Sequence, residues 1–206
     1  MLRMDTQTDS KAGQQGADPT TPAFSVRLPE NLAHLALRFR PISEYDLPFL
    51  LNLYSLSRQS ELSQVDWPEA QKQAFLAQQF NAQHHYYQQH FSTAHFDLIE
   101  FGGTAIGRLY WNLEKQRLCL IDIILLPAYQ HQGIGTAIIR GLMRAAANEA
   151  KRLELHVENN NPVRLLYSRL GFAHTGDSGV YQKMVWEPHT EQPLTPSTVA
   201  DALEME

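Results

Sequence analysis

The chain has 206 residues, 43% of them hydrophobic, and a formal net charge of −5, which suffices for one globular domain with a real core. No apolar run approaches the roughly 18 residues that cross a bilayer, so no membrane partner is expected. The acidic balance argues against nucleic acid as a partner and suits a cationic acceptor.

The chain is expected to begin with a disordered arm at residues 1–33, which are rich in Thr, Gln, Gly, Asp and Pro. Residues 35–40 alternate between large apolar and other residues, which is typical of a strand. Ser43 is the expected cap of a first helix, because Asp46 follows three residues on and Pro48 falls in the first turn.

A second helix is expected from Asp66, its candidate cap, through Pro68 in the first turn to about Phe91. This region carries a set of ring-bearing residues: Trp67, Phe75, Phe80, His84, His85, Tyr86 and Tyr87. Such a set can line an aromatic pocket for an organic cation, or it can pack the helix against a sheet. The sequence leaves both interpretations open.

Three antiparallel strands are expected at residues 96–101, 104–111 and 118–126, with Gly102 and Gly103 as a hairpin turn. The third strand contains Cys119, the only cysteine of the chain. A lone cysteine excludes an internal disulfide and indicates a reducing cytoplasm as the location. Its place in an apolar run predicts a buried structural thiol.

The most informative stretch follows the third strand and opens a helix expected over residues 133–150. It reads Gln130-His131-Gln132-Gly133-Ile134-Gly135-Thr136. The order strand, glycine loop, helix directs backbone N–H groups and the positive end of a helix dipole at one spot. The two glycines let the backbone approach a phosphate without Cβ atoms in the way. A pyrophosphate is the expected ligand, although the start of a merely packed helix can show the same pattern.

Two other phosphate-binding motifs fit poorly. The dinucleotide fingerprint requires a third Gly or Ala where Ile138 stands. A P-loop requires Gly-Lys-Ser or Gly-Lys-Thr, which the chain lacks. A nucleotide-dependent enzyme of the doubly wound type is therefore disfavoured.

The last third is expected to hold a strand at residues 153–157, a short helix ended by Gly171, and two strands at residues 172–175 and 181–186. The stretch at residues 160–172 reads Asn-Asn-Pro-Val-Arg-Leu-Leu-Tyr-Ser-Arg-Leu-Gly-Phe. A flexible tail is expected over residues 188–206, which leaves residues 34–187 as one domain.

With Gln-x-x-Gly-x-Gly at residues 130–135, this second stretch makes the chain resemble the GNAT superfamily of N-acetyltransferases over about residues 117–186. The resemblance implies an α/β (α+β) fold, a single domain with a mixed sheet of six or seven strands and helices on both faces. It implies an acyl-CoA-dependent N-acyltransferase in which a primary amine attacks the thioester of acetyl-CoA directly. A non-catalytic acyl-CoA-binding or protein-interaction module on this fold is the alternative. Monomer and homodimer both remain open.

The resemblance also implies where acetyl-CoA binds. The amides of residues 131–136 surround the pyrophosphate, and backbone groups of Leu125 meet the pantetheine arm where strands four and five splay apart. A backbone N–H near Ile124 or Leu125 is the candidate to polarise the thioester oxygen. The residues assigned to the cofactor are Ile124, Leu125, Gln130, His131, Gln132, Gly133, Ile134, Gly135, Thr136, Asn160 and Tyr167.

Two of these assignments carry alternatives. Asn160 serves equally well as the cap of the following helix, with Asn159 or Asn161 as substitutes. The family often has Arg or Lys where this loop has histidine and glutamine, so its positive charge is reduced. Three arginines are candidates to reach the CoA phosphates instead: Arg140, Arg164 and Arg169.

For catalysis the resemblance implies that Tyr167 protonates the departing thiolate, because a phenol keeps its proton at neutral pH. A half-buried tyrosine bound elsewhere is the alternative. Asp122, an acid in a buried apolar run, is a candidate general base. Further candidates for the base are Glu100, His156, His84 and His85. No metal site is expected, because two adjacent histidines do not share a helix face.

Overall fold

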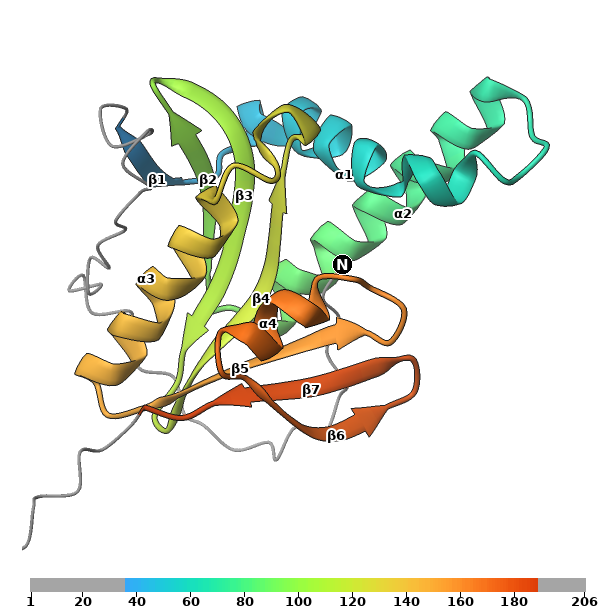
Figure 1. Ribbon diagram of the computed structural model, residues 1–206. Helices are drawn as coiled ribbons and strands as arrows, with labels where there is room; N and C mark the ends of the chain where they lie inside the picture. The colour runs from blue at the N-terminus through green and yellow to red at the C-terminus, as the bar shows by residue number, and fades with distance from the viewer. Residues whose placement is uncertain (1–35, 189–206) are drawn as a thin grey trace, which may run out of the picture.

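Seven strands form one mixed sheet in the order β1-β2-β3-β4-β5-β7-β6 (Figure 1). The computed structural model describes residues 36–188. Its elements are β1 (Leu37–Pro41), η2 (Glu44–Asp46), α1 (Leu47–Leu62), α2 (Glu69–His90), β2 (His95–Phe101), β3 (Thr104–Leu113), β4 (Arg117–Leu125), η3 (Pro127–Tyr129), α3 (Ile134–Asn148), β5 (Arg152–Glu158), α4 (Arg164–Arg169), β6 (Ala173–Ser178) and β7 (Tyr181–Trp186).

The first four strands are antiparallel neighbours, whereas β4 and β5 form a parallel pair. β3 is buried at seven consecutive positions, which fits a strand covered on both faces. The mixed sheet with helices on both faces confirms the predicted fold class, and the three antiparallel strands are confirmed with it. Cys119 is fully buried as predicted, and burial raises the pKa of its thiol well above the ordinary value.

The parallel pairing of β4 with β5 is short. It runs only from Arg117 opposite Arg152 to Leu120 opposite Leu155. β4 continues to Leu125 and β5 to residue 158 without pairing to each other. A register shift between β3 and β4 just beyond this point bends the sheet further. The predicted splay is therefore present, and α4 lies beside the opening (Figure 1).

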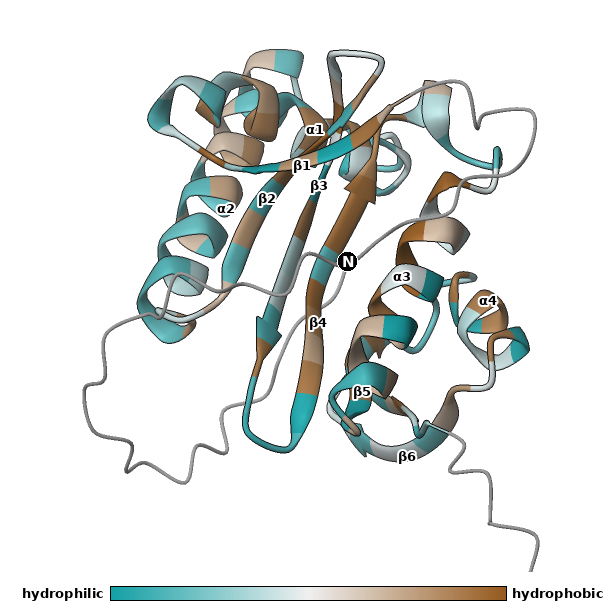
Figure 2. Cartoon of the chain, turned by 90° about the vertical axis from the view of Figure 1, so that its left-hand side faces the viewer, coloured by the Kyte–Doolittle hydropathy of each residue, from teal (hydrophilic) through white to brown (hydrophobic). Residues whose placement is uncertain are grey.

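The helices divide between the two faces of the sheet (Figure 2). On one face α3 packs through residues spaced four apart, and α4 joins the same core through Tyr167. On the other face α1 and α2 pack Leu50 and Phe80 against Leu98 of β2. The four-residue spacing of the buried residues of α3 is that of one helix face, as expected for an amphipathic helix. The opening between β4 and β5 therefore has α3 and α4 on one face of the sheet and α1 and α2 on the other.

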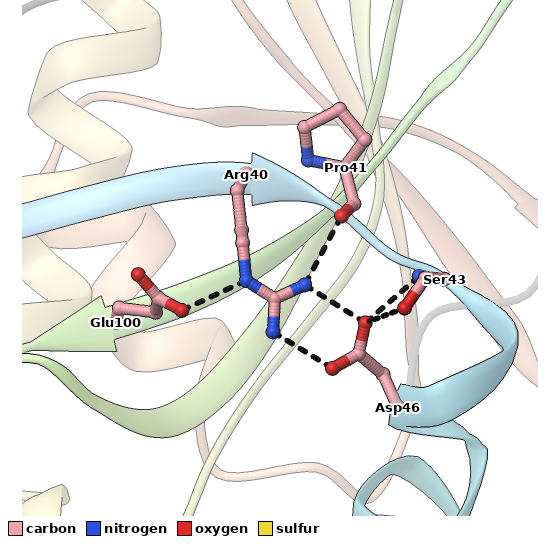
Figure 3. Close-up of polar contacts among 5 residues, drawn as sticks. All are labelled: Arg40, Pro41, Ser43, Asp46 and Glu100. Atoms are coloured by element: carbon pink, nitrogen blue, oxygen red, sulfur yellow. Dashed lines mark hydrogen bonds and ion pairs between the residues drawn. The ribbon is translucent and has the colours of Figure 1, made fainter.

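Arg40 of β1 fastens the start of the α1 region to the sheet edge (Figure 3). Its Nε donates to Glu100 Oε1 of β2 at 2.8 Å, and its two terminal nitrogens donate to the two oxygens of Asp46 at 2.8 and 2.7 Å. One of them also reaches the carbonyl oxygen of Pro41 at 3.3 Å. The backbone N–H and hydroxyl of Ser43 both donate to Asp46 Oδ2 at 2.8 Å. The predicted Ser43–Asp46 helix start is thus confirmed, with a 3-10 turn between it and α1.

The structure corrects one cap. Asp66 was expected to cap the second helix, but the N-cap position belongs to Pro68 and the helix begins at Glu69. Asp66 lies two residues before that position, too far back for its side chain to serve as the cap. The predicted arm at residues 1–33 and nearly all of the predicted tail lie outside the described residues. Within residues 36–188, no helix is long and apolar enough to cross a bilayer.

Replacing Asp46 with Ala should lower the free energy of unfolding by about 2 kcal/mol at pH 7, because the helix start and Arg40 lose one shared acceptor. Urea denaturation measures the change. Glu44→Ala is the control, since Glu44 is exposed in the same turn and should change stability by less than about 0.5 kcal/mol. Equal effects of the two substitutions would contradict the assigned role.

The same pair predicts a pH dependence. The hydrogen bonds from Arg40 hold the pKa of Asp46 well below its usual range. Because the pKa is lower in the folded state, the stabilisation is complete above the ordinary carboxyl value of about 3.9 and is lost as the pH falls below it. The stability gap between the native chain and Asp46→Ala should therefore shrink from about pH 4 to pH 2 in urea titrations. A constant gap would show that the ion pair does not carry the effect.

Candidate functional site

A groove of about 840 Å³ lies where β4 and β5 separate. Its walls come from the end of β4, the loop before α3, the end of β5 and α4, with the last turns of α1 on the far side. The groove collects nine of the eleven residues that the sequence assigned to a cofactor: Ile124, Leu125, Gln130, His131, Gly133, Gly135, Thr136, Asn160 and Tyr167. These nine residues are spread along the chain from Ile124 to Tyr167, and the fold brings them to one groove.

The loop before α3 is shaped as an anion site. His131 and Gly133 have positive φ angles of 59° and 83°, and the second lies at the N-cap of α3. None of the amides of residues 131–136 donates to a backbone carbonyl outside α3 within residues 36–188. A positive φ is costly for His131, which has a Cβ. The loop therefore presents unpaired N–H donors at the positive end of a helix dipole.

The remaining loop residues support this shape from behind. Gln130 Nε2 donates to the carbonyl oxygen of Leu125 at 2.7 Å and so ties the loop to the end of β4. Gln132 turns away from the groove, where its Nε2 donates to Ala128 O at 2.6 Å. The side chain of Ile134 is fully buried in the core. Gln132 and Ile134 do not line the groove, so each can offer only its backbone amide to a ligand.

The backbone of β4 directs alternate residues toward the opening. Leu126 N donates to Ile106 O of β3 at 2.8 Å. Antiparallel pairing alternates along the strand, so the backbone groups of Ile124 face β3 while those of Ile123 and Leu125 face the opening. A Cβ at Gly107 of β3 would overlap the carbonyl oxygen of Ile124, which agrees with this direction. Ile124 therefore lines the groove with its side chain, not with its backbone.

Tyr167 lies in the groove wall on α4 with its side chain almost fully buried. Its ring contacts that of Phe172 at 5.6 Å between centroids, and the amide of Phe172 donates to its carbonyl oxygen. Gly171 ends the helix as predicted, with a φ of 92°. Burial, and then the negative charge of Asp122, raise the pKa of the Tyr167 phenol above its ordinary value. The phenol therefore keeps its proton in the neutral range and can donate it.

The asparagine run divides the two roles that the sequence left open. Asn161 Oδ1 accepts from the amide of Val163 at 3.0 Å, and Val163 is the N-cap residue of α4. Both Asn160 and Asn161 line the groove, and only Asn161 is bound to the start of α4. Asn161 therefore organises the start of α4, which frees Asn160 for a ligand.

Asp122 does not line the groove. It is fully buried, and its Oδ2 accepts from Arg108 Nε at 2.7 Å and lies 2.6 Å from Arg108 Nη2. Arg108 also donates to Gln83 of α2 at 3.0 Å, and Gln83 donates to the hydroxyl of Tyr87 at 3.3 Å. Oδ1 of Asp122 has no hydrogen-bond partner among the described residues. This ion pair thus connects β3, β4 and α2 directly behind the groove.

None of the other candidate bases lines the groove. Glu100 is bound to Arg40 at the sheet edge. His84 stacks on Phe80 of α2, and burial, followed by the charge of Arg108, lowers the pKa of its imidazole. His85 and His156 likewise lie outside the groove wall.

The aromatic residues of α2 do not gather in one pocket. Phe80 and Tyr87 are buried against the sheet. Trp67 and Phe75 contact each other edge to face at 5.5 Å, and both are partly exposed. The packing interpretation of this set is therefore the correct one for its buried members, and none of the set lines the groove. Among residues 36–188 no group of His, Cys, Asp and Glu is arranged to hold a metal ion.

Sequence reasoning missed the groove wall opposite the loop. Arg58 and Glu61 of α1 and Glu158 at the end of β5 all line the groove. Glu158 directly precedes the asparagine run that leads into α4. This position at the end of the strand was the one sequence feature that could have indicated that Glu158 lines the groove. Of the three arginines proposed for phosphates, Arg169 lines the groove, whereas Arg164 donates to Gln182 at 3.1 Å.

The buried ion pair yields a stability prediction. Asp122→Asn should cost about 3–5 kcal/mol, because it leaves the Arg108 guanidinium buried without its counter-charge. The double substitution Arg108→Met with Asp122→Leu should recover at least half of that loss, since it removes both charges. Urea denaturation of the single and double variants measures both values. Additive losses in the double variant would show that the two side chains act independently.

Comparison with known proteins identifies the family of the chain. The model of the acetyltransferase (GNAT) family matches residues 51–172, which include the loop, the splay and Tyr167. No curated protein matches the chain.

Several solved structures share the fold. The PaiA N-acetyltransferase of Thermoplasma acidophilum, in complex with coenzyme A, has 18% identity and a TM-score of 0.56 and covers 74% of this chain and 99% of its own. An acetyltransferase from Thermus thermophilus has 19% identity and a TM-score of 0.55, covering 73% and 96%. RimL, a ribosomal L7/L12 alpha-N-protein acetyltransferase in complex with coenzyme A, has 20% identity and a TM-score of 0.51, covering 74% and 94%. At these identities the likeness concerns the fold.

Proposed function

Because the chain belongs to the acetyltransferase (GNAT) family, we propose that it transfers an acetyl group from acetyl-CoA to a primary amine by direct attack in a ternary complex. The single observation that carries the proposal is the groove, where the unpaired loop amides and Tyr167 share one cavity at the splay. The PaiA and RimL structures hold coenzyme A on the same fold, which supports this choice of co-substrate.

The residues present fit coenzyme A. The amides of residues 131–136 and the α3 dipole suit its pyrophosphate. The backbone groups of Ile123 and the N–H of Leu125 face the opening and suit the amides of the pantetheine arm, as in strand addition, whereas the carbonyl oxygen of Leu125 already accepts from Gln130. Arg169 and Asn160 line the same groove and can hold the remaining polar groups. Bound acetyl-CoA supplies the thioester, which is the activated acetyl donor.

The chemistry then needs two contributions from the chain. The amide of Ile123 or Leu125 can donate to the thioester oxygen, and one such donor is worth about 3 kcal/mol of barrier. The carbon–nitrogen bond forms as the amine lone pair attacks the thioester carbon, and the carbon–sulfur bond then breaks. Tyr167 gives its proton to the departing thiolate. The amine loses its own proton to a base or to water.

Asp122 stays a prediction as that base. Its Oδ1 has no partner, and its charge is close enough to raise the pKa of Tyr167. Its Oδ2 is held by Arg108, and its side chain is buried away from the groove wall. A proton can reach it only through an intervening group such as water. Whether or not Asp122 accepts the proton, its ion pair with Arg108 makes it a positioning residue for the splayed end of β4.

Thermal unfolding with acetyl-CoA, and with NAD and ATP as controls, tests the co-substrate first. A ligand at 100 times its dissociation constant stabilises by about 2.7 kcal/mol, which is roughly 5–10 °C for a domain of this size. A shift with acetyl-CoA alone is expected. No shift with acetyl-CoA or with longer acyl-CoA would remove the proposed co-substrate.

Tyr167→Phe should lower kcat by about 100-fold or more and leave acetyl-CoA affinity near normal, because only the donated proton is lost. Thiol release with an accepted amine gives kcat, and calorimetric titration gives the affinity. Tyr129→Phe is a matched control outside the groove wall, since Tyr129 belongs to the 3-10 turn before the loop. Unchanged turnover in Tyr167→Phe would take this tyrosine out of the mechanism.

Gly135→Asp should abolish acetyl-CoA binding without unfolding the chain. A Cβ at Gly135 would lie 3.7 Å from Leu125 Cδ1, an ordinary contact that the fold accommodates. The added carboxylate would repel a pyrophosphate at the loop. Calorimetric titration measures the loss, and Gly176→Asp, at an open position in β6, is the control. Undiminished affinity in Gly135→Asp would place the cofactor elsewhere.

A further inference from the structure

The groove has two ends with different charges. At the loop end lie the unpaired amides and His131, which suit an anionic ligand. At the α1 end lie Arg58 and Glu61 of α1 with Glu158 of β5, and the two carboxylates and one guanidinium carry a net charge of −1. One cavity therefore offers an anion-binding end and an acidic end.

The contacts at the acidic end are unequal. Arg58 Nη1 donates to the two oxygens of Glu61 at 2.7 and 2.8 Å, within one turn of α1. Arg58 Nη2 lies 3.7 Å from Glu158 Oε1, and the hydroxyl of Tyr181 donates to the same oxygen at 3.5 Å. Charge-assisted hydrogen bonds are usually 2.7–2.9 Å long. Arg58 is thus bound tightly to Glu61, whereas its contact with Glu158 across the groove is a long one.

The side chain of Glu158 is 19% exposed and those of Arg58 and Glu61 are 18% and 58% exposed. A carboxylate at that depth is only partly screened by water, so a cation that reaches it gains more than at an open surface. The residues at the α1 end line the same groove, but none of them belongs to the set assigned to the cofactor. Glu158 lies on this remaining wall.

We propose that the acceptor carries a second positive charge besides its reacting amine, and that Glu158 binds this charge. The inference rests on the proposed acetyl transfer and adds the class of acceptor: a diamine or another amine with a neighbouring cationic group. The second ammonium donates to Glu158 while Arg58 stays with Glu61. The reacting amine, deprotonated, then faces the thioester, and the acceptor's net charge complements the acidic end.

Steady-state kinetics with acetyl-CoA and three matched acceptors test the proposal: 1,4-diaminobutane, 1-aminobutane and 4-aminobutanoate. The diamine should have the highest kcat/KM, by about tenfold or more over the monoamine. Glu158→Gln should remove most of this preference by raising KM for the diamine, while kcat for the monoamine and KM for acetyl-CoA change little. Added salt should raise the diamine KM in the native chain more than in the variant.

Glu149→Gln makes the same charge change outside the groove, beside Lys151 after α3, and should keep the native preference. Equal kcat/KM for the diamine and the monoamine would overturn the inference while leaving acetyl transfer intact. A diamine preference that survives in Glu158→Gln would overturn it as well. No acetylation of any amine, despite bound acetyl-CoA, would instead count against the proposed function from which the inference starts.

Discussion

The early end of the β4–β5 pairing is the constraint on which the site depends. Four residue pairs hold the two strands together, from Arg117 opposite Arg152 to Leu120 opposite Leu155. Beyond them each strand must satisfy its backbone elsewhere. β5 does so by pairing with β7 to its end, and β4 keeps β3 on one side only. The unpaired edge of β4 therefore faces a space that a ligand with its own amides can fill.

The loop before α3 and the ion pair behind β4 hold this opening from two directions. Gln130 fixes the loop to the last residue of β4, so the anion site and the strand edge keep one geometry. Behind the strand, Arg108 and Asp122 are both buried, and Gln83 of α2 completes the contact. Buried ion pairs gain little stability over apolar packing, but they tolerate no missing partner. The pair thus acts by fixing where β4 lies relative to α2.

Local patterns in the sequence predicted the elements and one wall of the groove. The glycine loop, the spacing of apolar residues in α3 and the asparagine run each have a physical reason that works over a few residues. Asp66 failed as a cap because the helix begins three residues later, at Glu69, and the local pattern did not fix that start. The role of Asp122 was also hidden, since its partner Arg108 lies on another strand and no local pattern links the two.

The same limit explains why the sequence did not predict the acidic end of the groove. Arg58 and Glu158 are 100 positions apart, and only the packing of α1 on the sheet face opposite α3 brings them across one groove. A local motif identifies a cofactor site because a phosphate is held by consecutive amides of one loop. The proposed acceptor site is built from side chains on α1 and β5 that share no sequence neighbourhood. A sequence motif can therefore point to the donor site of this chain, whereas the proposed acceptor site can be recognised only from the tertiary arrangement of charges.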